Sequence, residues 1–123
     1  MDKEVILPLL KERKWSVNIE NLLFCESDQH ITKVFFINQI GTIDSKYVNL
    51  SIGHLSNKLV ERGFYRCHRT CLVNMNKVKP YGRYPKLQLN IDTEIIVPLS
   101  RRRRQEFHNA YLEMIKGRKN DQQ

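Results

Sequence analysis

Four consecutive arginines in the last third of the chain offer the most distinctive chemistry: Arg101, Arg102, Arg103 and Arg104. Ser100 before them is a favoured helix N-cap, and an apolar stripe at helical spacing follows, so we expect the run in the first turn of a helix. Cations at this end oppose the helix macrodipole, at a cost of roughly a few tenths of a kcal/mol each. A phosphate removes the conflict, because free backbone N–H groups and guanidinium groups bind it together. The run therefore favours phosphate binding over a solvated basic turn.

A second stretch, residues 63–74 (GFYRCHRTCLVN), mixes core-type side chains with cationic ones. As one continuous strand it would alternate between two faces, and neither face would be purely apolar. The first face would hold Phe64, Arg66, His68 and Thr70, and the second would hold Tyr65, Cys67, Arg69 and Cys71. We therefore interpret the stretch as a strand that leaves the core toward an anionic partner. An arginine near a strand end, here Arg69, can place its planar fork on guanine O6 and N7 in the major groove.

Positive charge is concentrated in one segment of the chain. Residues 62–104 hold eleven Lys or Arg and two acidic residues, a net charge of +9, while the remainder holds ten basic and eleven acidic residues, a net charge of −1. Segregated positive charge is typical of proteins that bind polyanions. We expect phosphate contacts from Lys77, Lys79, Arg102, Arg103 and Arg104. A module that binds an acidic protein or an anionic surface remains the alternative.

Enzymatic chemistry finds little support. The histidines are scattered along the chain: His30, His54, His68 and His108. No HExxH, GxSxG, P-loop or GxGxxG motif is present. The aspartates considered for a nuclease metal site, Asp28, Asp44 and Asp92, are isolated in turns or strands. We expect no enzyme, no metal and no cofactor, with a metal-dependent nuclease as the least favoured alternative.

The three cysteines, Cys25, Cys67 and Cys71, do not form a disulfide framework. On a continuous strand Cys67 and Cys71 would lie roughly 13 Å apart, too far for a disulfide. A zinc site built from Cys67, His68 and Cys71 lacks a second Cys/His pair at ligand spacing. We expect reduced, buried or half-buried thiols, and a thiol switch close to Arg69 is a weaker alternative.

The chain of 123 residues is long enough for one hydrophobic core. No apolar stretch approaches the length of a transmembrane helix, and the N-terminus is too acidic for a signal peptide. We expect a cytoplasmic protein with one domain at residues 1–116 and a polar, disordered tail at residues 117–123.

Several short strands are predicted from alternation or from buried apolar runs, at residues 15–19, 22–25, 34–37, 42–50, 87–91 and 94–98. Polar residues 26–30 predict a loop that ends at His30, and residues 38–41 predict a turn. Ser51 is a good N-cap for a helix of about three turns, which Gly63 would end in the left-handed conformation. The stripe of that helix is Ile52, Leu55 and Leu59. These elements place the basic residues at the ends of strands and at the start of the final helix.

Three segments together resemble one family. Residues 64–74 resemble the F-x-R-x-H-R-S-x-L-V-N signature of the LytTR family, the DNA-binding domains of bacterial response regulators. Residues 97–102 (VPLSRR) are similar to a second signature, a strand that ends in P-V-S-R-R, and residues 22–27 (LLFCES) resemble its I-x-Y-I-E-A stretch. The order and spacing also match, and the resemblance covers about residues 5–115. The chain departs from the signature at Cys71, which replaces an aromatic residue.

The resemblance implies a mainly β fold: an elongated arrangement of small antiparallel sheets, with one short helix between strands and a C-terminal helix. It implies a transcriptional regulator that binds specific double-stranded DNA through loops in successive major grooves, at direct-repeat promoter sites and with a possible second protomer. Matched by position, His30, Arg69 and Arg101 would contact bases. His68 then becomes a structural hydrogen-bonder beside Arg69. Family members usually carry a receiver domain before this one, so we expect a stand-alone regulator or an excised domain.

Overall fold

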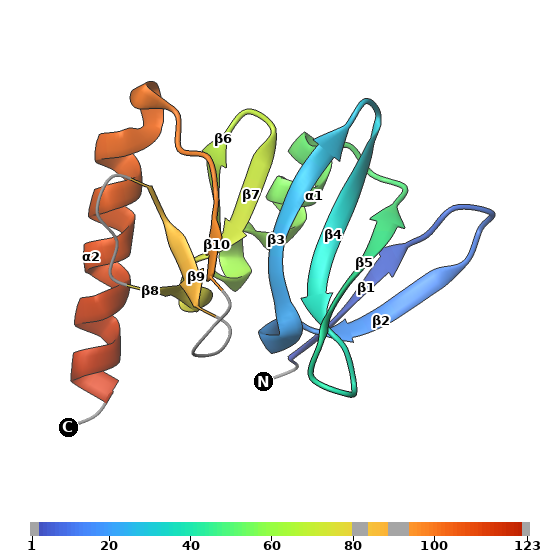
Figure 1. The fold of residues 1–123 in the computed structure, drawn as a ribbon, viewed down its shortest axis with the longest axis horizontal. Coiled ribbons are helices and arrows are strands. Elements are labelled where there is room, and N and C mark those ends of the chain that lie inside the picture. Colours follow the sequence, from blue (N-terminus) through green and yellow to red (C-terminus); the bar gives the residue numbers. More distant parts are fainter. Residues whose placement is uncertain (1–2, 80–83, 89–93, 122–123) are drawn as a thin grey trace.

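The computed structural model describes residues 3–79, 84–88 and 94–121, and it consists of three antiparallel sheets and two α-helices (Figure 1). The central sheet has five strands in the order β5 (Ile43–Val48), β4 (Ile31–Ile37), β3 (Leu22–Asp28), β7 (Cys71–Asn74) and β6 (Phe64–His68). A hairpin of β1 (Glu4–Pro8) and β2 (Lys14–Asn18) forms the second sheet. The third contains β8 (Val78–Lys79), β9 (Lys86–Gln88) and β10 (Glu94–Ile96). The predicted mainly β class is confirmed.

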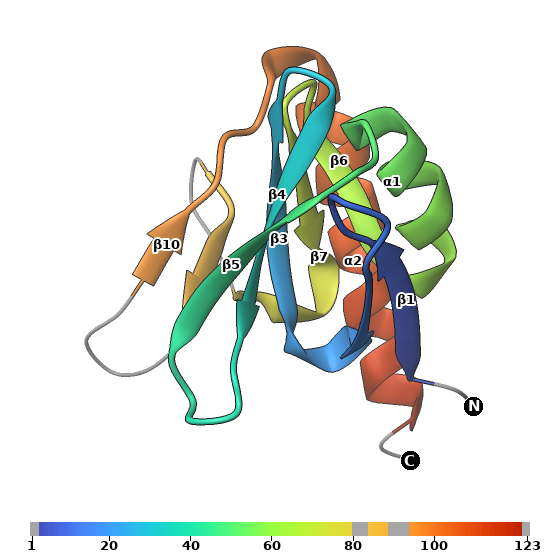
Figure 2. The same ribbon diagram turned by 90° about the vertical axis from the view of Figure 1, so that its right-hand side faces the viewer.

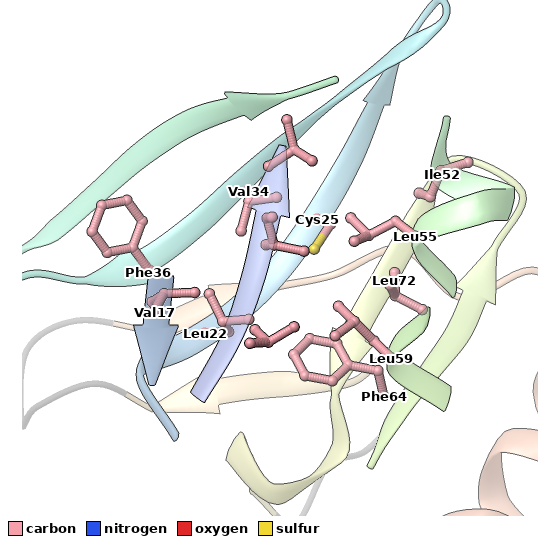
Figure 3. Packing of buried hydrophobic residues seen from close by; sticks show 13 residues of the cluster. Val17, Leu22, Cys25, Val34, Phe36, Ile52, Leu55, Leu59, Phe64 and Leu72 are labelled. Carbon is pink, nitrogen blue, oxygen red and sulfur yellow. The ribbon is translucent and has the colours of Figure 1, made fainter. Parts of the chain in front are cut away.

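Two hydrophobic cores lie against the central sheet. The first packs the sheet against the β1–β2 hairpin and helix α1 (Ile52–Leu59), and its labelled side chains point toward one another in Figure 3. The second packs the sheet against the third sheet and helix α2 (Arg104–Asp121). Strand alternation divides the residues between them, because Val34 and Phe36 enter the first core while Phe35 and Ile37 lie against the second.

Helix α1 forms where the sequence predicts it. The Ser51 hydroxyl accepts a hydrogen bond from the backbone N–H of His54, which satisfies a free donor of the first turn. The predicted stripe of Ile52, Leu55 and Leu59 is buried in the first core. A short 3-10 turn, η2 (Val60–Arg62), extends the helix, and Gly63 ends it with φ of 91°. Glycine suits this position because it adopts positive φ without a steric penalty.

The prediction of one continuous strand across residues 63–74 is wrong. The stretch is a tight hairpin, in which β6 and β7 pair antiparallel and His68 lies opposite Cys71. Residues 66 and 67 of β6 together oppose only Leu72 of β7, so a β-bulge interrupts the alternation. The bulge and the turn also overturn the predicted faces, and they remove the continuous strand on which the predicted wide spacing of Cys67 and Cys71 depended. Cys67 and Cys71 are both buried, and the Cys67 thiol donates to the Cys71 carbonyl over 3.7 Å.

Other boundaries shift by a few residues. Strand β3 continues through Asp28, so the predicted polar loop at residues 26–30 shrinks to a two-residue turn. The predicted hairpin near the third sheet is present, with Glu94 opposite Gln88, although residues 89–93 lie outside the described part of the chain. Helix α2 runs to Asp121, and the domain boundary at residue 116 stays a prediction.

Candidate nucleic-acid interface

Three connections from distant parts of the sequence lie at one end of the molecule. They are the β3–β4 turn, the β6–β7 turn and the segment that leads into α2 (Figures 1 and 2). The N- and C-termini and the β4–β5 loop lie at the opposite end in both views. We call the first end the turn edge and define it as residues 29–30, 69–70 and 100–104. It holds all three residues predicted to contact bases.

His30 lies in the β3–β4 turn. Asp28 and Ile31 are paired on either side, so only two residues make the connection. Gln29 adopts φ of 57°, in the left-handed region, which lets the chain reverse within this short distance. The His30 side chain is exposed at the tip. The extended β3 therefore lifts His30 to the end of the sheet, where it is available to a partner.

Arg69 lies in the β6–β7 turn, which side chains of the hairpin hold in shape. The backbone N–H of Thr70 donates to Nδ1 of His68 over 3.2 Å. The Thr70 hydroxyl lies 2.8 Å from the same nitrogen. His68 is thus a structural hydrogen-bonder, and the exposed side chain is that of Arg69.

The segment before α2 is a 3-10 turn, η4 (Arg101–Arg103), and the α-helix begins only at Arg104. The predicted capping bond is absent, because the partly buried Ser100 hydroxyl has no hydrogen-bond partner among the described residues. Arg101, Arg102 and Arg104 are exposed, whereas Arg103 is half-buried. Its Nη1 donates to the backbone carbonyl of Arg66 over 3.2 Å, so Arg103 supports the structure beneath the surface.

Backbone hydrogen bonds join the three segments of the turn edge to one another. The N–H of Ser27, near the end of β3, donates to the Thr70 carbonyl over 2.9 Å. The N–H of Ser100 donates to the Cys67 carbonyl over 2.9 Å. Each bond joins segments that are more than 30 residues apart in the chain. The turn edge is therefore one connected surface, which sequence inspection does not reveal.

The exposed arginines at the turn edge have no carboxylate nearby, in the described part of the chain, that would form an ion pair with them. Among the described residues, no carboxylate lies within ion-pair distance of Arg69, Arg101, Arg102 or Arg104. The ion pairs that the structure contains, such as Lys3 with Glu20, lie elsewhere. An unpaired guanidinium keeps its donors free for a planar acceptor such as a phosphate or a guanine edge.

Two predicted phosphate contacts lie away from this surface. Lys77 belongs to the 3-10 turn η3 (Met75–Lys77), which follows the end of β7 that is remote from Arg69. It lines a polar pocket with Glu20, whose negative charge it faces. Lys79 is exposed on β8 of the third sheet. The structure does not bring either lysine to the turn edge.

The cysteines are buried and lie below the turn edge. A hydrogen bond with Cys67, together with burial, raises the pKa of the Cys71 thiol. Burial alone raises the pKa of Cys25. A thiol with a raised pKa stays protonated and reacts slowly, so this environment does not favour the thiol-switch alternative. No group of three potential ligands from His, Cys, Asp and Glu comes together within the described ranges.

The chain matches a known family of proteins. The family model described as the LytTr DNA-binding domain matches residues 12–111. The chain therefore belongs to the LytTr DNA-binding domain family, as its three signature segments predict, and DNA binding is the activity that defines this family.

A solved structure gives the same fold. It is described as the LytTr DNA-binding domain of a methyl-accepting/DNA response regulator from Bacillus cereus, and it shares 20% sequence identity with this chain. The match has a TM-score of 0.64 and covers 89% of this chain and 97% of that one. A search of curated proteins finds no match. No helix in the described part of the chain is long and apolar enough to cross a membrane.

Proposed function

We propose that this domain is a transcriptional regulator that binds specific double-stranded DNA with its turn edge, placing its turns in successive major grooves. The observation that carries the proposal is the convergence of three sequence-distant connections on one end of the fold, where the exposed cations have no acidic partner among the described residues. His30, Arg69 and Arg101 would contact base edges. We assign phosphate contacts to Arg102 and Arg104, which are exposed.

Arg103 and the two lysines have smaller roles in this proposal. Arg103 already donates to the Arg66 carbonyl, so it adds charge from below the surface and holds the segment in place. Lys77 and Lys79 lie away from the turn edge and are left out of the interface. We further propose direct-repeat sites about one helical turn apart, with two copies on one face of the duplex, in the cytoplasm.

The test begins with selection of a preferred duplex from random sequences. Binding of this duplex and of a random duplex is then measured by fluorescence anisotropy over a series of salt concentrations. Arg69→Ala should weaken the selected duplex by about 1–3 kcal/mol and relax the preference at one base pair. Arg102→Ala should weaken all duplexes alike and reduce the slope of log K against log salt by about 0.9.

Lys79→Ala is the matched control, because it removes one exposed positive charge away from the turn edge. It should leave the preference and the salt slope unchanged. If Lys79→Ala has the same effect as Arg102→Ala, the DNA does not lie on the turn edge. If the wild-type protein selects no duplex and binds every polyanion equally, the alternative of a basic interaction module is correct.

A further inference from the structure

Arg66 is a half-buried cation of the basic segment, and part of its guanidinium lies inside the fold. Its Nη2 donates to the backbone carbonyl of Arg69 over 2.6 Å. A Cβ atom placed on Gly53 would lie 3.7 Å from its Nη1, so the guanidinium rests beside the first turn of α1. Its Nε is buried and has no hydrogen-bond partner among the described residues. The side chain therefore spans the space between α1 and the β6–β7 turn.

The β-bulge explains how Arg66 reaches this position. Arg66 and Cys67 together oppose Leu72, which breaks the regular alternation of β6 just before the turn. A bulge inserts an extra residue and changes the direction of a side chain. Cys67 enters the second core, and Arg66 is free to turn toward the carbonyl at the tip. The hairpin thus contains a built support for the residue that we expect to contact a base.

The backbone of Arg66 extends the support to the other connections. Its carbonyl accepts the hydrogen bond from Arg103, which lies in the segment of Arg101. The Thr70 carbonyl, one residue after Arg69, accepts from Ser27 of β3. A displacement of the Arg66 guanidinium would therefore first change the position and orientation of Arg69 at the tip of the turn. It would then change the distance between Arg69 and Arg101.

We propose that Arg66 is a positioning residue for base recognition: it fixes the Arg69 turn from below and determines sequence preference without contacting DNA. The proposal rests on the proposed function of the turn edge. Arginine is required because its planar fork can contact the carbonyl with one nitrogen while another packs beside Gly53. A lysine keeps the charge, but it offers a single flexible ammonium in place of the fork.

The test compares Arg66→Lys with Arg13→Lys, a matched exchange in the exposed loop of the β1–β2 hairpin. Binding of the selected and the random duplex is measured across the same salt series. Arg66→Lys should weaken the selected duplex by about tenfold or more, while affinity for random duplex stays within about twofold and the salt slope is unchanged. Arg13→Lys should change none of these quantities.

Two binding results would overturn the proposal. Wild-type preference in Arg66→Lys shows that the support is unnecessary. Parallel weakening of both duplexes with a smaller salt slope shows that Arg66 contacts a phosphate directly. If the wild-type protein prefers no duplex, the proposed function fails first, and the structural part of the proposal is judged separately.

That separate measurement uses the unmodified protein, so it does not depend on how a variant folds. Nitrogen-15 NMR at low temperature should show hindered rotation of the Arg66 guanidinium and slow exchange of its Nη2 hydrogens, because one of them is bonded to the Arg69 carbonyl. The exposed Arg13 guanidinium should rotate freely. Free rotation at Arg66 as well would show that the support does not exist in solution.

Discussion

Phe107 anchors the N-terminal part of α2, and its replacement by alanine gives a sharp stability prediction. The side chain is fully buried, and its ring meets that of Tyr65 edge-on at 5.4 Å with an interplanar angle of 78°. Truncation of a fully buried phenylalanine costs about 3–5 kcal/mol, which includes the cavity that remains. The edge-on aromatic pair adds about 0.5–1.5 kcal/mol beyond buried area, so we expect a total loss of about 5 kcal/mol.

The assay is urea unfolding followed by circular dichroism, with Leu112→Ala as the control on the same helix. Leu112 is 42% exposed, so its truncation should cost less than about 1 kcal/mol. The expected loss at Phe107 is a large part of the roughly 5–15 kcal/mol that stabilises a typical domain. A loss below about 1 kcal/mol, or one equal to that of Leu112→Ala, would refute the view that Phe107 holds α2 against the second core.

Three further predictions concern two hydrogen-bonded side chains and the thiols. Asn74→Asp replaces the amide that donates to the Leu22 carbonyl over 2.9 Å, so the acid should have a raised pKa in the fold. The variant should lose about 2–4 kcal/mol of unfolding free energy at pH 7. Because the folded state binds the carboxyl proton more tightly than the unfolded state, unfolding curves at pH 4 to 7 should show this loss growing as pH rises. Burial and the hydrogen bond to Glu106 raise the pKa of Tyr65. The wild-type protein should therefore be more stable than Tyr65→Phe by about 0.5–1 kcal/mol at pH 8, and this difference should disappear as the pH passes the raised pKa. A difference in stability that persists above that pH would exclude this contact. The three cysteines should react with a thiol-specific dye only at the rate of opening or unfolding, and DNA binding should resist mild oxidant; fast labelling of the native protein would contradict their burial.

Local signals in the sequence predict helix α1 well, because all its determinants are close together in the chain. Ser51 supplies the cap, Leu55 lies in the stripe, and Gly63 ends the segment. The same local reasoning fails for the β6–β7 hairpin. Its turn contains none of the residues that usually mark a turn: glycine, asparagine or proline. The bulge at Arg66 also interrupts the alternation of side chains from which the two strands could be predicted. The hairpin is held by short-range side-chain bonds, such as that of Arg66 to the Arg69 carbonyl, which none of the usual turn residues marks in the sequence.

The candidate site divides in the same way. Charge placement and the family resemblance are enough to select Arg69 and Arg101, and the resemblance alone selects His30. The connections that hold these residues together join segments far apart in the chain, such as Arg103 with Arg66, and no local pattern predicts them. Charge placement also selects Lys77. In the fold, Lys77 lies beyond the far end of β7, at the opposite end of the sheet from Arg69. Closeness in sequence does not predict this, because a strand separates the two residues.

The two cores differ in when their residues emerge during synthesis. Among the residues that the structure describes, the buried members of the first core lie between Val5 and Leu72, whereas the second core needs side chains as late as Phe107 and Tyr111. Because N-terminal units tend to fold first as a chain leaves the ribosome, the first core can close while α2 is still being made. The turns of His30 and Arg69 would then form early, and the arginines before α2 would join them last. Nascent chains long enough for Asn74 to have left the ribosome, but not yet α2, should therefore already protect the central sheet from proteolysis, before any of them can bind DNA.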